Sequence, residues 1–370
     1  MECNEITYLL NDVVDVYVKD LPKESTYMQF YFINTRRKIG ISMAPVAVEL
    51  IKCFSEGASL QTISAAYSEE YSSQELDQFL DFLVVNQVIV PDIDQAIVPP
   101  CFEKEALFVQ EWIGKSPLTW PTAKKVLIVG CGSVGGAIAE ILIRGGVNHL
   151  GLLDFKMLGE SDQVRHVHYD SRLVGLHKAD VLQQYLRGIR ENILISILDR
   201  KITPFTQMGS VFDQDYDLVV NTADEPYIGY TSILLGRWVR KKRIPLYVAG
   251  GFDAHLFSTG DFYDTSQADC VECTADFFST SLENWKPTYF VPERGHAHGG
   301  FEEDLILGGA GGHLAGSLFA ASYAAMNILN FLHGGVQWRG SQHRRGEYDN
   351  LSGLLNWIEI PAKHKCAHHE

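Results

Sequence analysis

Hydrophobic and polar positions alternate early in the chain and then change to helical spacing. The alternating segments Tyr27–Ile33 and Ile39–Met43 flank a polar turn, which predicts a β-hairpin. Pro45–Gly57 has proline near its start and glycine past its end, as helices often do, and Ser59 is a candidate cap for a second helix. A third helix is predicted over residues 72–85. Its apolar face holds Leu76, Phe79, Leu80 and Leu83.

From Lys125 the pattern changes to buried strands that alternate with helices. "KVLIVG", "HLGLLDF" and "YDLVVN" are short apolar segments, and a helical segment separates the first two. Such alternation is typical of a parallel sheet covered on both faces. We therefore predict an α/β protein with a Rossmann-like, mostly parallel sheet flanked by helices, preceded by a small winged-helix (α+β) domain. The predicted limits are 1–100 for the small domain, 101–124 for a linker and 125–370 for the α/β domain.

One long apolar segment, Leu305–Leu332, requires a choice between a core helix and a membrane span. It contains His313, Ser317, Ser322 and Asn327 together with several glycines. These residues favour a buried helix that follows a glycine-rich loop, and we expect no membrane partner. The small residues also suit close helix packing, which a subunit interface could use.

The charge balance bears on the role of the small domain. The formal net charge of the chain is −15, and residues 1–100 hold 15 acidic and six basic side chains. Nucleic-acid binding needs clustered lysine and arginine, so we expect no nucleic-acid partner. The hairpin edge could instead accept an extended peptide as an added strand, or the domain could serve packing alone.

Cysteine content and the first residues bear on the compartment. Seven cysteines, an odd number with four of them isolated, do not form a disulfide framework. The first residues, "MECNEITYLLNDVVD", have neither a basic region nor an apolar one, so no secretory signal is predicted. We expect a cytoplasmic protein.

A glycine-rich turn lies between the first strand and helix of the α/β domain. Gly130, Gly132 and Gly135 have the spacing at which a tight turn lets backbone N–H groups and a helix N-terminus approach a phosphate. Asp154 ends the next strand, where an acid can bond a ribose hydroxyl. NAD, FAD and ATP all carry a ribose and phosphates, so these residues leave the three cofactors open.

Residues further along the chain separate these cofactors. Arg165 lies in the polar loop after Asp154, and Lys178 lies at the start of a helix. A triphosphate whose pyrophosphate departs needs such positive charge. Asp224 follows a later buried strand, where a carboxylate can hold Mg²⁺ beside substrate phosphates, although it could also be a helix cap. These residues favour ATP, and a nicotinamide oxidoreductase becomes a minor alternative.

The order of these motifs resembles the ThiF/MoeB family of adenylating enzymes, which share a fold with ubiquitin-activating enzymes. The resemblance rests on the glycine loop, Asp154, "DQVRH", "GLHKAD" and "TADEP". It implies that ATP and Mg²⁺ activate a carboxylate as an acyl-adenylate, that Arg165, Lys178 and Asp224 are catalytic, and that the protein is a homodimer. The chain departs from the family pattern at Asp162, His166 and Gly229, which stand where asparagine, glutamine and arginine are usual.

The same resemblance implies a structural zinc ion. Cys270 and Cys273 form one CxxC pair, which is half of a tetrahedral site. The family usually has a second pair near the C-terminus, where this chain has Cys366 and His369. His364 or His368 could replace His369, and the alternative is a redox CxxC or unrelated cysteines.

The small first domain resembles the leader-recognition domain of enzymes that mature ribosomally synthesised peptides, including the group that acts in microcin C and pantocin A biosynthesis. This resemblance implies a precursor peptide as partner, held by residues 1–100, with its C-terminal or side-chain carboxylate adenylated during antibiotic (bacteriocin) maturation. The alternatives are an activating enzyme for a ubiquitin-like or sulfur-carrier protein, and a non-catalytic peptide-binding scaffold.

Overall fold

A computed structural model describes most of the chain and divides it into two compact units. The first unit comprises Met1–Trp120 with His333–Gly335, and the second comprises Pro121–Leu332 with Val336–Glu370. The assignment of limits and roles to a peptide domain, a linker and an adenylating domain stays a prediction. The described residues are 6–22, 25–33, 35–92, 100–102, 104–106, 108–109, 120–204, 206, 208–211, 215–225, 228–249, 252–253, 256–265, 270–281, 313–333 and 344–361.

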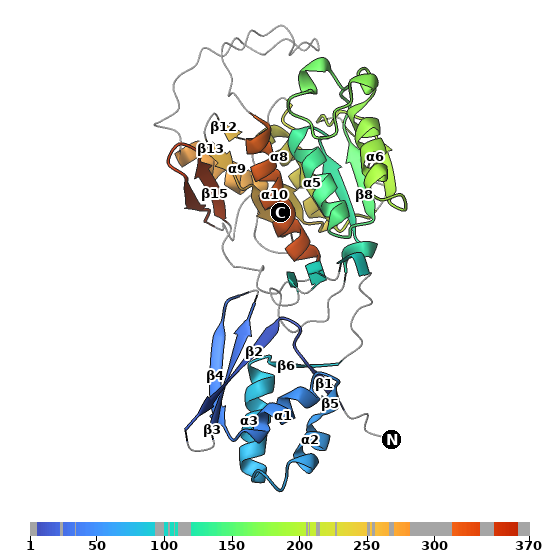
Figure 1. Ribbon diagram of the computed structural model, residues 1–370. Coiled ribbons are helices and arrows are strands. Elements are labelled where there is room, and N and C mark those ends of the chain that lie inside the picture. Colours follow the sequence, from blue (N-terminus) through green and yellow to red (C-terminus); the bar gives the residue numbers. More distant parts are fainter. Residues whose placement is uncertain are drawn as a thin grey trace, which may run out of the picture. The chain divides into compact units, whose positions relative to one another are not determined.

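The first unit contains two small antiparallel sheets and three helices (blue in Figure 1). The larger sheet has the order β2 (Val14–Leu21), β3 (Ser25–Phe32), β4 (Lys38–Met43). The smaller has the order β5 (Ala58–Ser59), β1 (Thr7–Leu10), β6 (Ile89–Pro91). The helices are α1 (Val46–Cys53), α2 (Leu60–Ala66) and α3 (Ser73–Val85). The predicted hairpin and three helices are confirmed, whereas β1 and β2 were not predicted.

Local capping explains where two of these helices begin. The Ser59 hydroxyl accepts the Thr62 backbone N–H at 2.9 Å, which confirms the predicted cap of α2. A capping box between Ser72 and Glu75 starts α3. The four predicted apolar residues of α3 are all buried and pack against the inner face of β3. That face consists of Met28, Phe30 and Phe32, none of which is exposed.

The second unit is built on a six-stranded sheet in the order β14-β11-β10-β7-β8-β9. The strands are β7 (Lys125–Val129), β8 (His149–Leu153), β9 (Leu194–Leu198), β10 (Leu218–Asn221), β11 (Leu246–Val248) and β14 (Asp261–Tyr263). All neighbours pair in parallel except β14, which is antiparallel to β11. The predicted α/β class and mostly parallel sheet are therefore confirmed.

Helices cover both faces of this sheet, as its apolar strands require (Figure 1). Val126 and Ile128 of β7 face a core formed with α5, α6 and α10, whereas Leu127 and Val129 face a core formed with α8 and α9. Successive residues of a strand point to opposite faces, so both sets must be apolar. The helices are α5 (Ser133–Arg144), α6 (Lys178–Ile189), α8 (Ile228–Lys242), α9 (Val271–Ser281) and α10 (Leu314–Leu332).

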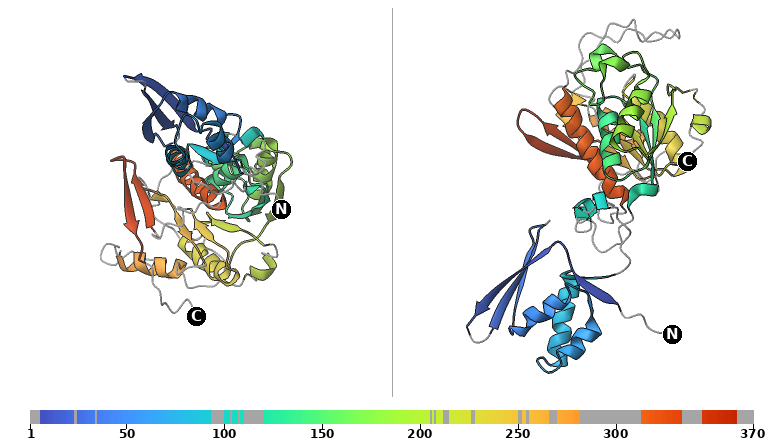
Figure 2. Two further views of the ribbon diagram at one scale, coloured as in Figure 1. Left: turned by 90° about the horizontal axis from the view of Figure 1, so that it is seen from below. Right: turned by 45° about the vertical axis from the view of Figure 1, so that its right-hand side comes forward.

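Helix α10 is the segment that could have been mistaken for a membrane span. It has the length and mean hydropathy, 1.2, of a spanning helix, and it is the one helix of the described part of the chain that does. Its alanine-rich face is buried in the core beside α5, and Figures 1 and 2 show the two helices side by side. The two helices pack closely at Gly145, where a β-carbon would meet the Leu329 methyls at 2.7 Å and force that side chain to shift. This packing accounts for the apolar sequence of α10.

A four-stranded antiparallel sheet completes the second unit, with the order β12-β13-β15-β16. An ion pair between the buried Asp261 and the partly buried Arg345 links it to strand β14 of the large sheet. Its strands are β12 (Phe252–Asp253), β13 (Leu256–Ser258), β15 (Arg344–Asp349) and β16 (Leu354–Glu359). The short helices are α7 (Met208–Val211), η1 (Pro100–Phe102), η2 (Pro121–Ala123), η3 (Glu160–Asp162) and η4 (Ser171–Leu173).

Candidate active site

A cavity of about 570 Å³ opens at the carboxyl ends of β7, β8 and β10. This is where open α/β sheets bind ligands, and the volume suits a nucleotide-sized molecule. The structure brings most of the predicted site residues to its wall, on segments far apart in the sequence. They are Gly130, Gly132, Asp154, Arg165, Lys178 and Asp224. Their roles toward a ligand stay predictions.

The glycine loop has the conformation that its sequence predicts. Gly130 has φ +94°, and its N–H donates to the carbonyl of Leu153 at 2.8 Å. A β-carbon on Gly135 would overlap the carbonyl oxygen of Gly130, so this glycine lets α5 pack against the loop. Gly132 caps α5, and a β-carbon there would find only His166 within 4.0 Å. The N-terminus of α5 therefore borders open space, as an anion site requires.

Asp154 ties the end of β8 to the glycine loop. Its Oδ2 accepts the N–H of Cys131 at 2.7 Å, and its Oδ1 accepts the N–H of Lys156 at 2.8 Å. The residue is 8% exposed and lines the cavity. Burial raises the pKa of Cys131 well above its usual value, so its thiol stays protonated and is no nucleophile.

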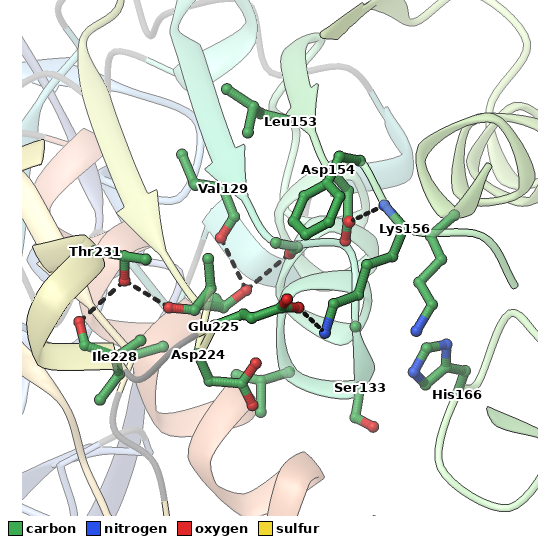
Figure 3. A pocket seen from close by; sticks show the side chains of 18 of the residues that line it. Val129, Ser133, Leu153, Asp154, Lys156, His166, Asp224, Glu225, Ile228 and Thr231 are labelled. Atoms are coloured by element: carbon green, nitrogen blue, oxygen red, sulfur yellow. Dashed lines mark hydrogen bonds and ion pairs between the residues drawn. The ribbon is translucent and has the colours of Figure 1, made fainter. Parts of the chain in front are cut away.

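Asp224 is positioned by a set of buried hydrogen bonds after β10. Asn221 is fully buried and donates to the hydroxyls of Thr231 and Ser232 at the start of α8. The Thr222 hydroxyl donates to the carbonyl of Gly130 at 2.7 Å. The loop that carries Asp224 is thereby fixed to both α8 and the glycine loop, and Figure 3 shows its carboxylate beside the cavity.

Two lysines flank a carboxylate at the rim of the cavity. Glu225 pairs with Lys156 at 2.6 Å (Figure 3) and with Lys201 at 3.3 Å, so it links the ends of β8, β9 and β10. Burial lowers the pKa of Lys156, but the Glu225 carboxylate outweighs burial and the pKa is raised. This group could not be predicted from the sequence, because nothing in the spacing of these residues marks them as partners.

The two predicted phosphate-binding cations meet at Asp162. Lys178 lies 3.0 Å from one oxygen of this carboxylate, and Arg165 lies 3.4 Å from the other. Lys178 is buried, whereas the side chain of Arg165 is 51% exposed. The sequence marked Asp162 only as a departure from the family pattern, and its pairing with both cations was not foreseen.

Two histidines lie beneath this ion-pair group. His166 and His168 have ring centroids 5.0 Å apart and are both buried. Burial and the nearby Lys178 lower the pKa of each to about 4, so both rings are neutral at physiological pH. Gly136 makes room for His168, since a β-carbon there would meet the ring at 2.5 Å.

Only half of the predicted zinc site lies in the described part of the chain. Cys270 and Cys273 are buried around the first turn of α9. Cys366 and His369, with the alternatives His364 and His368, lie outside the described residues. Among the described residues, no group of three or more His, Cys, Asp or Glu side chains could hold a metal ion. The zinc site stays a prediction.

The family is shown by comparison with known sequences. The ThiF family profile matches residues 109–366, which is more than half of the chain, so the protein belongs to the ThiF family. The family and the fold support an ATP-dependent adenylating enzyme, the class that the sequence predicted.

Curated relatives match only part of the chain. Adenylyltransferase and sulfurtransferase uba4 of Aspergillus fumigatus is 35% identical over 31% of this chain and 24% of its own length. DNA damage tolerance protein RHC31 of Saccharomyces cerevisiae is 30% identical over 36% of this chain and 37% of its own. The tRNA threonylcarbamoyladenosine dehydratase of Escherichia coli is 28% identical over 36% of this chain and 48% of its own length. The chain thus spans less than half the length of these relatives.

Solved structures match nearly the whole chain. The microcin C7 biosynthetic enzyme MccB, in complex with N-formylated MccA, superposes with a TM-score of 0.69 at 17% identity, covering 98% of this chain and 100% of that one. Escherichia coli MccB with ATP gives 0.67 at 16%, with the same coverage. PaaA gives 0.59 at 15%, covering 81% of this chain and 96% of its own. At these identities the likeness establishes the fold.

Proposed function

We propose that the protein adenylates a carboxylate on a ribosomally synthesised precursor peptide during maturation of a peptide antibiotic. The observation that carries the proposal is the meeting of a helix N-terminus, two cations and Asp224 in one nucleotide-sized cavity. The likeness to MccB over both units supports a peptide substrate, because MccB structures contain the peptide MccA.

In the proposed reaction an oxygen of the substrate carboxylate attacks the α-phosphorus of ATP. The bond from that phosphorus to the bridging oxygen breaks, and pyrophosphate leaves with the electron pair. Lys178, Arg165 and the N-terminus of α5 stabilise the charge that develops on the phosphates. Mg²⁺, held by Asp224 together with the phosphates, would supply further charge neutralisation. Asp154 would orient the ribose.

The first unit would hold the leader of the peptide at strand β4. The Phe32 N–H donates to the carbonyl of Arg37, and β3 pairs with β4 from Tyr31↔Lys38 to Thr26↔Met43. Alternation along the strand therefore directs the N–H groups of residues 38, 40 and 42 away from β3. β4 is an edge strand, so these donors can pair with an extended peptide.

The remaining elements of the proposal come from the family resemblance. A structural Zn²⁺ at Cys270, Cys273, Cys366 and His369 would fix the C-terminal segment, and buried thiols near a helix start suit such a site. We also propose a homodimer and a cytoplasmic location.

Two measurements test the proposal. Incubation of the protein with ATP, Mg²⁺ and the precursor peptide encoded nearest its gene should give an adenylated or further modified peptide in a mass spectrum. Ser42→Pro removes one outward donor of β4 and should weaken peptide binding about tenfold or more, whereas Ser42→Thr keeps the donor and should bind as the native protein does. Equal binding by both variants would contradict a leader site at β4.

The curated relatives favour a second candidate, the activation of a sulfur-carrier or ubiquitin-like protein. That function would leave the first unit without a role. A folded β-grasp partner that is adenylated in place of the peptide would establish it. Peptide binding with no turnover of ATP would instead indicate a non-catalytic scaffold.

A further inference from the structure

The carboxylate of Asp162 is buried in the wall of the cavity and has four nitrogen atoms close to it. Its Oδ2 lies 3.0 Å from the Lys178 ammonium and accepts the Gly159 N–H at 3.0 Å. Its Oδ1 lies 3.3 Å from Nε2 of His166 and 3.4 Å from the Arg165 guanidinium. The side chain is only 5% exposed. The two cations that the proposed function assigns to phosphates, Lys178 and Arg165, are thus already paired with a carboxylate of the protein.

This carboxylate is held so that it stays charged and in place. Burial raises the pKa of Asp162, but the Gly159 amide and the Lys178 ammonium outweigh burial, and the pKa is lowered. Gly159 and Asp162 belong to the same short helical turn, so the carboxylate cannot swing away without losing the hydrogen bond that caps that turn. His166 is neutral and adds no positive charge.

Lys178 can donate hydrogen bonds to two anions at once, but it has only one positive charge to balance them. An ammonium has three N–H donors, so one can remain on Asp162 while the others reach a phosphate. The negative charge of Asp162 nevertheless reduces the attraction of Lys178 and Arg165 for a second anion in a partly buried site. Asparagine would keep the shape and one acceptor oxygen while removing this charge.

We propose that Asp162 is an internal counter-ion that competes with pyrophosphate for Lys178 and Arg165, so that pyrophosphate leaves the site readily. The inference rests on the proposed adenylation site and adds a positioning residue to it. Asp162 holds both cations against the cavity wall before nucleotide enters and pairs with them fully again as pyrophosphate departs. Its effect is to weaken binding of the product at some cost in affinity for ATP.

The test is calorimetric binding of inorganic pyrophosphate, with Mg²⁺ present, to the native protein and to Asp162→Asn. The variant should bind pyrophosphate tighter by roughly tenfold, and ATP tighter in the same direction, because one opposing charge is gone. Binding of adenosine, which has no phosphates, should be unchanged. Glu160→Gln removes an exposed negative charge from the same turn and should leave pyrophosphate affinity within about twofold.

Equal or weaker binding of pyrophosphate by Asp162→Asn would overturn the inference, as would an equal gain in Glu160→Gln. If Asp162→Asn does not fold, Asp162→Ser provides a second neutral variant with an acceptor oxygen. It is expected to bind pyrophosphate tighter by the same factor. The binding measurement needs no peptide. A protein that binds pyrophosphate as described but never modifies a peptide would contradict the proposed function and leave this inference standing.

Discussion

The carboxylate of Asp154 accepts the backbone N–H of Cys131 at 2.7 Å, so the end of β8 holds the glycine loop that follows β7. The second oxygen of the same carboxylate accepts the N–H of Lys156, the first residue of the ion-pair group at the rim. One buried side chain therefore shapes two walls of the cavity. Asp154 at the end of this strand therefore stabilises the two loops whether or not a ligand is bound.

Asp154→Ala should destabilise the protein and abolish ATP binding. The substitution leaves two backbone N–H groups without their acceptor, which costs about 2 kcal/mol or more in the free energy of unfolding. The loop would also lose the conformation that presents the helix N-terminus. Denaturant unfolding measures the first effect and calorimetry with ATP the second. Unaltered ATP affinity would contradict the placement of Asp154 at the nucleotide.

Gly135→Ala should lower the free energy of unfolding by about 1–3 kcal/mol, because its β-carbon would overlap the Gly130 carbonyl oxygen. Gly188 offers a matched control in helix α6. Nothing lies within 4 Å of a β-carbon there, so Gly188→Ala should stabilise the protein by about 0.5–1 kcal/mol. Equal effects of the two substitutions would show that close packing at the loop is not required.

The fold could be predicted from the sequence further than the site could. Periodicity indicated β7, β8 and β10, because fully buried strands are apolar throughout, and the glycine spacing indicated the loop. Strands β1 and β2 were missed: β1 has only four residues, and β2 is largely exposed although Val14, Val16 and Val18 alternate along it. β1 is defined by its pairing with β5 and β6, which lie far away along the chain, and local sequence does not encode such pairing.

Within the site, the residues at strand ends could be predicted from the strand pattern alone, whereas Arg165 and Lys178 were predicted from the order of the motifs. Gly130, Asp154 and Asp224 follow directly from where their strands stop. The Lys156–Glu225 pair and the position of Asp162 between Arg165 and Lys178 depend on how separate loops meet. The spacing of residues along the chain does not predict such contacts between loops.

Burial of His168 should make stability depend on pH. Its pKa is lowered to about 4 in the folded protein, below the 6.5 that is usual in an unfolded chain. The unfolded chain therefore takes up a proton first as the pH falls, and stability is lost between pH 6.5 and 4, with about 2 kcal/mol lost at pH 5. Above pH 7 the group contributes no pH dependence.

Thermal melts between pH 7.5 and 5 check this expectation. His168→Leu cannot be protonated, so its melting temperature should fall less over that range than that of the native protein. His166 follows the same trend in both proteins, because burial and Lys178, which lower its pKa most, are present in both. Parallel curves would mean that the His168 ring is hydrated and titrates normally.

The zinc prediction is open to a direct test of metal content. Cys270→Ser should release bound zinc and lower the melting temperature, because a thiolate ligand is lost and folding of a structural site depends on its metal. Cys101 is exposed, and Cys101→Ser provides a control that should change neither quantity. Elemental analysis of the purified native protein comes first. If the purified protein contains no zinc, the predicted zinc site is wrong.

The central claim is that the cavity activates a carboxylate with ATP, and exchange of labelled pyrophosphate into ATP tests it most directly. The native protein with Mg²⁺ and its precursor peptide should exchange, and omission of the peptide should abolish the signal. Asp224→Asn should lose exchange by about 100-fold or more, since it removes the proposed Mg²⁺ ligand, whereas Glu225→Gln should retain most of it. Absence of exchange in a native protein that binds both ATP and the peptide would contradict adenylation.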